Sequence, residues 1–232
     1  MKVLKHQYID QDIELGNGSI YNLVIQNPQY LRRFLYSLEE QIDDGDDFFL
    51  LAEKGKQKDL SKEGFIIWNP LKIEVDQKKL DTIIQKDLAV HTTQSQKEEY
   101  QLLLQKINEY IESLSFSYSL PLTFQSELTL QNFLKAISLS TIEEPEEFLQ
   151  KILFQIKKIA FGFSFDIFFF LNLHDYLSEE EMNIFIKEMK SMELFPVLIS
   201  SYLPSYKIDD EFVIIIDQDL CEIHIDSKVR KS

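Results

Sequence analysis

The chain has 232 residues, of which 44% are hydrophobic and 12% aromatic, and its formal net charge at pH 7 is −15. This hydrophobic content excludes a disordered chain, and the length allows one large domain or two small ones. The acidic balance argues against a nucleic-acid partner, which usually meets a basic surface, although the distribution of charges decides this question rather than their sum.

The first seventy residues combine strands with one helix. A Gly-Asn-Gly turn at residues 16–18 separates two strand-like segments, residues 12–15 and 19–25, in a pattern typical of a β-hairpin. Asn27 then offers an N-cap and Pro28 a first helical residue, and apolar side chains follow every three or four residues. Two further short strands are predicted at residues 48–51 and 65–68.

The middle of the chain shows helical stripes and little strand signal. Four helices are predicted there, around residues 80–88, 100–114, 130–137 and 145–159. The polar segment at residues 91–97 is predicted to be a loop or a bend between helices.

After Gly162, strands and helices alternate again. Residues 167–171 form a continuous apolar run, which is typical of a strand covered on both faces. Ser178 and Glu181 have the spacing of a capping box for the next helix. Two more strands are predicted at residues 196–200 and 212–216.

This order predicts an α/β head domain interrupted by an all-helical insertion. We place the head at residues 1–70 and 161–232 and the insertion at residues 71–160. The head is typical of a nucleotide-binding fold, but a phosphate loop needs Gly and Lys after the first long strand, and the chain reads Gln-Asn-Pro-Gln-Tyr at residues 26–30. Asn172 follows the later strand, where an Asp that binds Mg²⁺ would lie. We therefore expect a degenerate nucleotide site.

Signals for catalysis are weak. His174 and Asp175 could form an acid/base pair, although polar loop residues more often cap helices or face water. No pair of histidines has the spacing of a metal site. Five acids are nuclease candidates only because acids abound: Asp12, Glu14, Glu53, Asp217 and Asp219. We therefore expect binding and assembly, and no enzymatic activity.

Targeting signals are also absent from the sequence. No apolar run approaches the roughly 20 residues that cross a bilayer, and the first twelve residues are polar, so we expect no signal peptide. The single cysteine, Cys221, permits no internal disulfide and no cysteine-rich zinc site. A cytoplasmic protein is the expectation.

Three collinear stretches resemble one known family. They read IELGNGSIYNLVIQNPQYLRRFLYSL, DLSKEG…WNPLKIEVDQKKL and FFFLNLHDYLSEEE…LISS…FVIIIDQDLCEI. Together they cover nearly the whole chain, and although each motif is weak alone, their order is similar to that of the small accessory protein of type II-A CRISPR–Cas loci, the Csn-two family.

The resemblance implies an α/β head related to P-loop ATPases, with a degenerate nucleotide site and an inserted helical leg. It implies a ring-shaped homotetramer whose central hole is lined by basic residues. Such a ring binds linear double-stranded DNA, prefers ends, reads no sequence and has no enzymatic activity. It acts in spacer acquisition, a step of antiviral defence, alongside the integrase proteins and the effector nuclease.

The resemblance also implies stabilising Ca²⁺ ions. Glu127, in the segment SELTL, matches an acidic position of the family. Neighbouring positions that are often acidic in the family are amides here, and because Ca²⁺ takes six to eight oxygen ligands, we expect weak binding. Glu143 and Glu144 either supply further ligands or form a solvated helix start.

Non-specific DNA binding requires Lys and Arg that meet phosphates. The candidates are Arg32, Arg33, Lys54, Lys56, Lys58, Lys62, Lys157 and Lys158, with a basic tail at Lys228, Arg230 and Lys231. The first five are the leading ones. Ordinary surface charge is the alternative for each, and the chain as a whole could instead be an acidic protein–protein adaptor without DNA contact, or a metal-dependent nuclease or ATPase.

Overall fold

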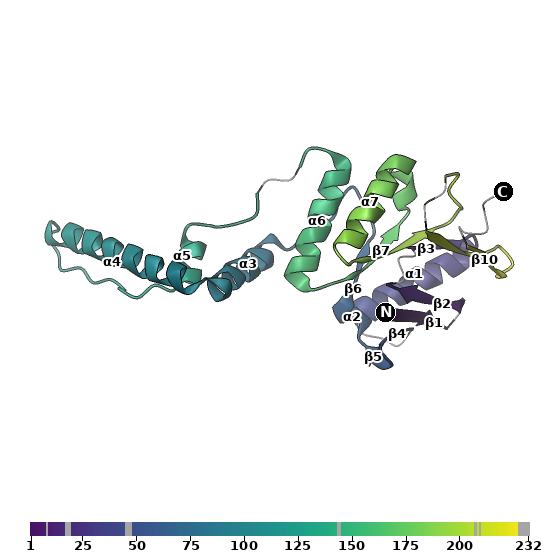
Figure 1. The fold of residues 1–232 in the computed structure, drawn as a ribbon, viewed down its shortest axis with the longest axis horizontal. Helices are drawn as coiled ribbons and strands as arrows, with labels where there is room; N and C mark the ends of the chain where they lie inside the picture. The colour runs from purple at the N-terminus through teal and green to yellow at the C-terminus, as the bar shows by residue number, and fades with distance from the viewer. Residues whose placement is uncertain are drawn as a thin grey trace. The chain divides into compact units, whose positions relative to one another are not determined.

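The structure is a computed structural model that describes residues 1–7, 9–16, 20–44, 48–142, 145–206, 208 and 210–226. The chain divides into two compact units (Figure 1). The first, here called the head unit, comprises Met1–Val75 and Glu144–Ser232, and the second, the helical unit, comprises Asp76–Glu143.

The core of the head unit is a six-stranded sheet. Its strands, in order across the sheet, are β10 (Glu222–Asp226), β9 (Glu211–Ile216), β3 (Ile20–Ile25), β8 (Phe195–Ser200), β7 (Ile167–Leu171) and β6 (Gly64–Ile67). All neighbours are parallel except β10, which runs antiparallel to β9. Every residue of β3 is buried, as expected for a central parallel strand covered on both faces.

A second, antiparallel sheet accompanies the first. Its strands, in order, are β2 (Ile9–Leu15), β1 (Lys2–His6), β4 (Phe49–Glu53) and β5 (Lys56–Lys58). The predicted hairpin between residues 12–15 and 19–25 is therefore wrong, because β2 pairs with β1 while β3 lies in the other sheet. The alternating burial of β2 suits a half-covered antiparallel strand, whereas β3, which is apolar except for Asn22, is buried along its whole length and requires cover on both faces.

Helices cover both faces of the large sheet (Figure 1). The helices of the head unit are α1 (Pro28–Asp43), α2 (Leu60–Glu63), α6 (Phe148–Phe163) and α7 (Glu179–Ser191), with a 3₁₀ turn, η1, at Leu173–Asp175. Phe169 of β7 packs in a cluster with α1 and the antiparallel sheet, and Phe168 packs in a second cluster with α6 and α7. The continuous apolar run predicted for this strand is thus confirmed, since each face meets its own core.

The expected domain boundary at residue 160 differs from the observed one. Helix α6 was expected in the helical insertion, but Ile152, Ile156 and Ile159 are buried in the same cluster as β7 and α7. Because its apolar stripe needs the sheet for burial, α6 belongs to the head unit. The helix also begins at Phe148 rather than at Pro145.

The helical unit contains α3 (Gln77–His91), α4 (Gln94–Phe116) and α5 (Leu130–Ala136). The predicted bend shortens to two residues, because Thr93 caps α4 in a capping box with Gln96. Helices α3 and α5 contact each other, and the Tyr100 hydroxyl donates to the Leu128 carbonyl at 2.6 Å, which ties α4 to the segment before α5. In the part of the chain that the structure describes, no helix is both long and apolar enough for a membrane span.

Candidate nucleic-acid interface

The junction between β3 and α1 is the place where a nucleotide-binding fold would hold phosphate. Here Asn27 caps the helix, and its Oδ1 accepts from the amides of Gln29 and Tyr30, both at 3.0 Å. Pro28 has no amide hydrogen to offer. The amide of Leu31 donates to the Asn27 carbonyl at 2.9 Å. The first helical amides therefore already have partners inside the chain, and none is left to surround a phosphate.

The loop between β9 and β10 closes this junction from the other side. The Asn27 side-chain amide donates to the Gln218 carbonyl at 2.9 Å, and the Gln218 side-chain amide donates to the Gln26 carbonyl at 2.6 Å. These reciprocal bonds place the loop on the turn that would otherwise carry a ligand.

The end of β7 carries a residue with unusual backbone geometry. Asn172 has a φ of 52°, in the left-handed region, and its amide donates to the Ile199 carbonyl of β8 at 2.8 Å. Its side-chain Oδ1 is buried without a hydrogen-bond partner. Asparagine tolerates this conformation better than most residues, which accounts for an amide at this position on backbone grounds alone.

His174 and Asp175, considered as an acid/base pair, make separate contacts. The buried His174 ring meets the Asn22 amide through Nε2 at 3.2 Å and the Tyr206 hydroxyl through Nδ1 at 3.0 Å. Asp175 instead accepts from the Tyr202 hydroxyl. Burial lowers the pKa of His174 to about 4, against a smaller opposing effect of Asp175, so the ring is neutral at pH 7. The ring joins η1 to β3.

Two of the predicted basic residues are held by acids. The Lys58 ammonium lies 3.3 Å from a carboxylate oxygen of Glu53 and 3.3 Å from one of Glu63. Lys62 lies 2.9 Å from the carboxylate of Asp59. Hydrogen bonds to these acids raise the pKa values of both lysines, but their charges are largely offset, so they offer less to a phosphate.

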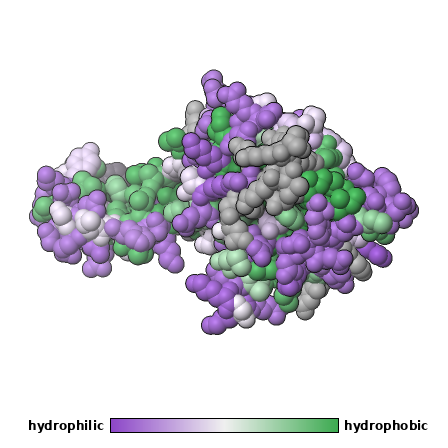
Figure 2. All heavy atoms as spheres, turned by 45° about the vertical axis from the view of Figure 1, so that its right-hand side comes forward, coloured by the Kyte–Doolittle hydropathy of each residue, from purple (hydrophilic) through white to green (hydrophobic). Residues whose placement is uncertain are grey.

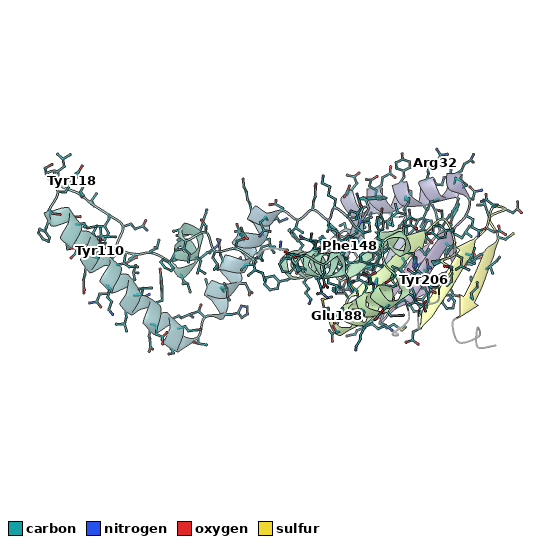
Figure 3. The ribbon with its side chains drawn as sticks, turned by 90° about the horizontal axis from the view of Figure 1, so that it is seen from above. Arg32, Tyr110, Tyr118, Phe148, Glu188 and Tyr206 are labelled. Carbon is teal, nitrogen blue, oxygen red and sulfur yellow. The ribbon has the colours of Figure 1, made fainter. Side chains whose placement is uncertain are left out.

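Arg32 and Arg33 differ from those lysines. Both are exposed on α1, and neither forms an ion pair or a hydrogen bond with any of the described residues. Figure 3 shows the Arg32 side chain on the outer side of α1. The acids of this helix, Glu39, Glu40 and Asp43, lie in its C-terminal half. The first half of α1 therefore presents two free guanidinium groups to solvent.

The tip of the β4–β5 hairpin carries two more exposed cations. Lys54 and Lys56 are exposed and form no ion pair within the described ranges. Lys54 and Gly55 form a two-residue turn with φ values of 49° and 75°. Such turns favour Asn or Gly at both positions, so a lysine there costs on the order of 1 kcal/mol of backbone strain.

The remaining basic candidates fall into two groups. Lys157 on α6 is exposed without an ion pair in the described part of the chain, whereas the Lys158 ammonium lies 4.8 Å from the centre of the Phe154 ring. The basic tail lies outside the described residues.

Of the three predicted metal ligands, Glu127 alone lies among the described residues. Glu127 is exposed beside a groove of about 740 Å³ that α4 lines with further glutamates. Glu143 and Glu144 lie outside the described residues. Among the residues that are described, no three His, Cys, Asp or Glu side chains are grouped so that they could hold a metal ion, which also applies to the five nuclease candidates.

Tyr36 was not singled out from the sequence. It is 64% exposed on α1, four residues after Arg32 and three after Arg33. The helical spacing was visible in the sequence, but the exposure of the ring depends on which face of α1 the sheet covers.

Comparison with known proteins adds the following. Residues 41–220 match the family described as CRISPR-associated protein (Cas_Csn2). No curated protein matches the chain. The crystal structure of Stu0660 of Streptococcus thermophilus is similar, with a TM-score of 0.53 and 15% identity over 99% of this chain and 78% of that one. At this identity the likeness concerns the fold alone.

Two ATP-binding cassettes of ABC transporters are also similar, though more weakly. MJ1267 in its ADP conformation has a TM-score of 0.48 at 12% identity, covering 99% of this chain and 92% of that one. A nucleotide-free cassette has a TM-score of 0.47 at 12% identity, covering 99% and 94%. The α/β class is established by the parallel sheet with helices on both faces. Because the family match spans well over half of its length, the chain belongs to the CRISPR-associated protein (Cas_Csn2) family.

Proposed function

We propose that this protein is a non-catalytic binder of double-stranded DNA that prefers ends, reads no sequence, and acts in CRISPR spacer acquisition as a ring-shaped homotetramer in the cytoplasm. The observation that carries the proposal is the free guanidinium pair of Arg32 and Arg33, on the helix whose N-terminus has no amide left for a nucleotide.

A net charge of −15 is compatible with this role if the basic groups that remain free are gathered. Four exposed cations per subunit form no ion pair with described residues, namely Lys54 and Lys56 at a hairpin tip and the two arginines of α1. They would contact the phosphate backbone and position the duplex without reading bases, because contacts to phosphates carry no sequence information.

Assembly multiplies these contacts. Helix α4 carries an apolar stripe, here called the α4 stripe, formed by Leu103, Ile107, Tyr110 and Leu114 at helical spacing. Leu103, Tyr110 and Leu114 are 44%, 64% and 50% exposed. Figure 2 shows hydrophobic residues on the surface of the helical unit, at the left of the view. A second copy of the chain would cover this stripe, and four copies would bring about eight arginines to one duplex.

The absence of catalysis is part of the proposal. The helical amides after Pro28 are used within the chain, and the β9–β10 loop lies on the same turn. A cycle of ATP hydrolysis needs these groups free for the phosphates and a metal ion beside them. ATP and Mg²⁺ should therefore leave DNA binding unchanged and yield no ADP, and turnover that is lost on substituting Asn172 would reverse this conclusion.

A salt series tests the DNA contact. Wild-type protein should bind linear duplex with an affinity that falls steeply with salt, because each neutralised phosphate contributes a slope of about 0.9 in a log–log plot. The double variant Arg32→Ala, Arg33→Ala should flatten this slope and weaken binding at least tenfold. The matched control, Lys58→Ala with Lys62→Ala, removes the same charge from residues already paired with acids and should change both far less.

The alternatives are outcomes of the same experiment. A protein that fails to bind linear duplex at low salt would overturn the proposal and favour the adaptor, whose acidic surface meets a basic protein. Binding to closed-circular DNA as tight as binding to linear DNA would remove the preference for ends. Pull-down of the integrase proteins and the effector nuclease, with and without DNA, examines the proposed partners directly.

We also propose Ca²⁺ as a structural ion near Glu127. Glu127 borders the groove along α4, whose amide and carboxylate oxygens are of the type that suits this ion, although the described carboxylates are not grouped there to hold it by themselves. Thermal melting should rise with Ca²⁺ in the wild type and rise less in Glu127→Gln. Equal shifts in both proteins would remove Glu127 from the ligand set.

A further inference from the structure

Helix α1 carries an exposed aromatic ring beside its free cations. Tyr36 follows Arg33 by three residues and Arg32 by four, so the three side chains lie on one face of the helix. At 64% exposure Tyr36 is the most exposed aromatic residue in the described part of the head unit. The structure gives it no hydrogen bond and no ring contact with described residues.

A single exposed tyrosine is ordinary, so the ring alone carries no argument. Its neighbours change the interpretation. Guanidinium groups without acids recruit phosphates, and a ring one helical turn away then lies within reach of the nucleotides that those phosphates join. Phe34 and Leu38, on the opposite face of α1, are buried in the core, so the helix cannot rotate to bury Tyr36.

The chemistry of a duplex restricts what this ring can contact. Inside a duplex every base is stacked on two others and shows only its edges, and a phenol ring gains little there. At an end, the outer face of the last base pair is uncovered. Aromatic side chains stack on such faces with any base, which matches binding that prefers ends and reads no sequence.

We propose that Tyr36 stacks on the terminal base pair of linear DNA while Arg32 and Arg33 hold the adjoining phosphates. This inference rests on the proposed function, and it gives the preference for ends a specific contact on the subunit. A ring-shaped tetramer that is threaded onto DNA would also favour ends, without any such contact. A probe at the terminal base pair is therefore needed to distinguish these two origins of the preference for ends.

Helix α6 repeats the arrangement in a weaker form. Phe161 is 54% exposed and follows Lys158 by three residues and Lys157 by four. The Lys158 ammonium, however, lies over the Phe154 ring and is less available to phosphate. Phe161 is therefore the internal rival for the same role and belongs in the test.

The experiment uses the full-length protein and short duplexes that carry 2-aminopurine at the terminal pair or at a central pair. Wild-type protein should lower the fluorescence of the terminal probe and leave the central one unchanged. Tyr36→Ala should abolish this change and weaken binding to short duplexes about tenfold, which equals about 1.4 kcal/mol. The salt slope should stay as in the wild type, because no charge is removed.

Three variants control the result. Tyr36→Phe keeps the ring and should retain the terminal signal. Tyr118→Ala removes a ring of similar exposure, 58%, without basic neighbours, and should retain it as well. Phe161→Ala should also retain it. Light scattering and a thermal melt on each variant confirm that assembly and folding are intact.

Failure of the proposed function and failure of the stacking role of Tyr36 give different results. If wild-type protein binds no linear duplex, both the proposed function and this inference are overturned. If it binds but Tyr36→Ala keeps the full terminal signal, or if Phe161→Ala alone loses it, the DNA-binding role stands and the stacking role of Tyr36 is refuted.

Discussion

The head unit and the helical unit bury their apolar residues to very different degrees. In the head unit, both faces of the parallel sheet are covered, and Phe168, Phe169 and Phe170 are fully buried. In the helical unit, Leu80 and Leu104 are the buried apolar residues among those described, while most of the large apolar side chains of α4 face solvent. The head unit buries its apolar residues in its own core, whereas the helical unit leaves much of its apolar surface exposed.

The largest expected difference in stability between the two units comes from removing a core side chain. Phe169→Ala leaves a cavity between β7 and the antiparallel sheet and should lower the free energy of unfolding by about 3–5 kcal/mol. Leu102→Ala, at a position that is 62% exposed on α4, should change it by less than about 0.5 kcal/mol. Urea unfolding of both variants measures the difference, and equal losses would contradict the contrast in burial.

A buried ion cluster is the next largest effect. The Lys2 ammonium donates to Glu63 at 2.5 Å and to Asp166, and its side chain is 10% exposed. Lys2→Met leaves two carboxylates without their cation and should cost about 2 kcal/mol, below the range for a fully buried pair because Asp166 is 30% exposed. Lys5→Met, from a pair that is half exposed, should cost less than about 0.5 kcal/mol.

The same cluster has a defined pH window. Burial alone would lower the pKa of Lys2, but hydrogen bonds to Asp166 and Glu63 outweigh it, and the pKa is raised above 10.5. When folding raises the pKa of a basic group, its protonated form stabilises the folded state. This stability is fully present below the pKa of the unfolded state and is lost as the pH rises through the pKa of the folded state. The advantage of wild type over Lys2→Met should therefore hold at pH 7 and shrink above about pH 10.5.

Burial of His174 predicts an effect of comparable size at acid pH. Its pKa is lowered to about 4 by burial, so the unfolded chain takes up a proton first as the pH falls below 6.5. Stability present at neutral pH should then be lost between about pH 6.5 and 4, by about 3 kcal/mol. His174→Asn should show a flatter pH dependence than wild type in urea unfolding.

A matched histidine lies in the helical unit. His91 is exposed at the end of α3 and pairs there with Asp87. His91→Asn serves as the exposed control in the same series of urea unfolding measurements. A histidine effect as large in the helical unit as in the head unit would show that burial is not its cause.

Substitution within the α4 stripe should have the smallest effect on the folding of a single chain and a large one on association. Leu103→Ser with Leu114→Ser should change the unfolding free energy by no more than about 0.5 kcal/mol each, because both side chains are largely exposed. Light scattering across a concentration series should nevertheless show dissociation at concentrations where wild type is assembled. A variant that stays assembled would remove the α4 stripe from the interface.

Much of the local structure could be predicted because it depends on neighbouring residues. The cap at Asn27, the capping box of Ser178 and Glu181 and the doubly covered β7 all follow from spacing and side-chain chemistry. Strands β1, β5 and β10 were missed because short alternating segments with charged residues give little strand signal.

The candidate interface could also be predicted only in part. Sequence identified the basic residues, but Lys58 and Lys62 are offset by Glu53, Glu63 and Asp59, while the arginines of α1 are free. Glu63 also forms an ion pair with Lys2, which lies on a strand far away in the sequence. No spacing rule predicts such pairing, because it depends on which segments the sheets bring together.

By itself, the sequence determined the α/β class, the family, the lack of a phosphate loop and the set of available charges, since these depend on residue type and order. Only the tertiary structure decided that β2 pairs with β1 rather than with β3 and that α6 packs in the head unit. It also decided that the face of α1 with Arg32, Arg33 and Tyr36 is exposed. The physical reason is burial, because which face of an element meets a core is fixed by contacts between residues far apart in the chain.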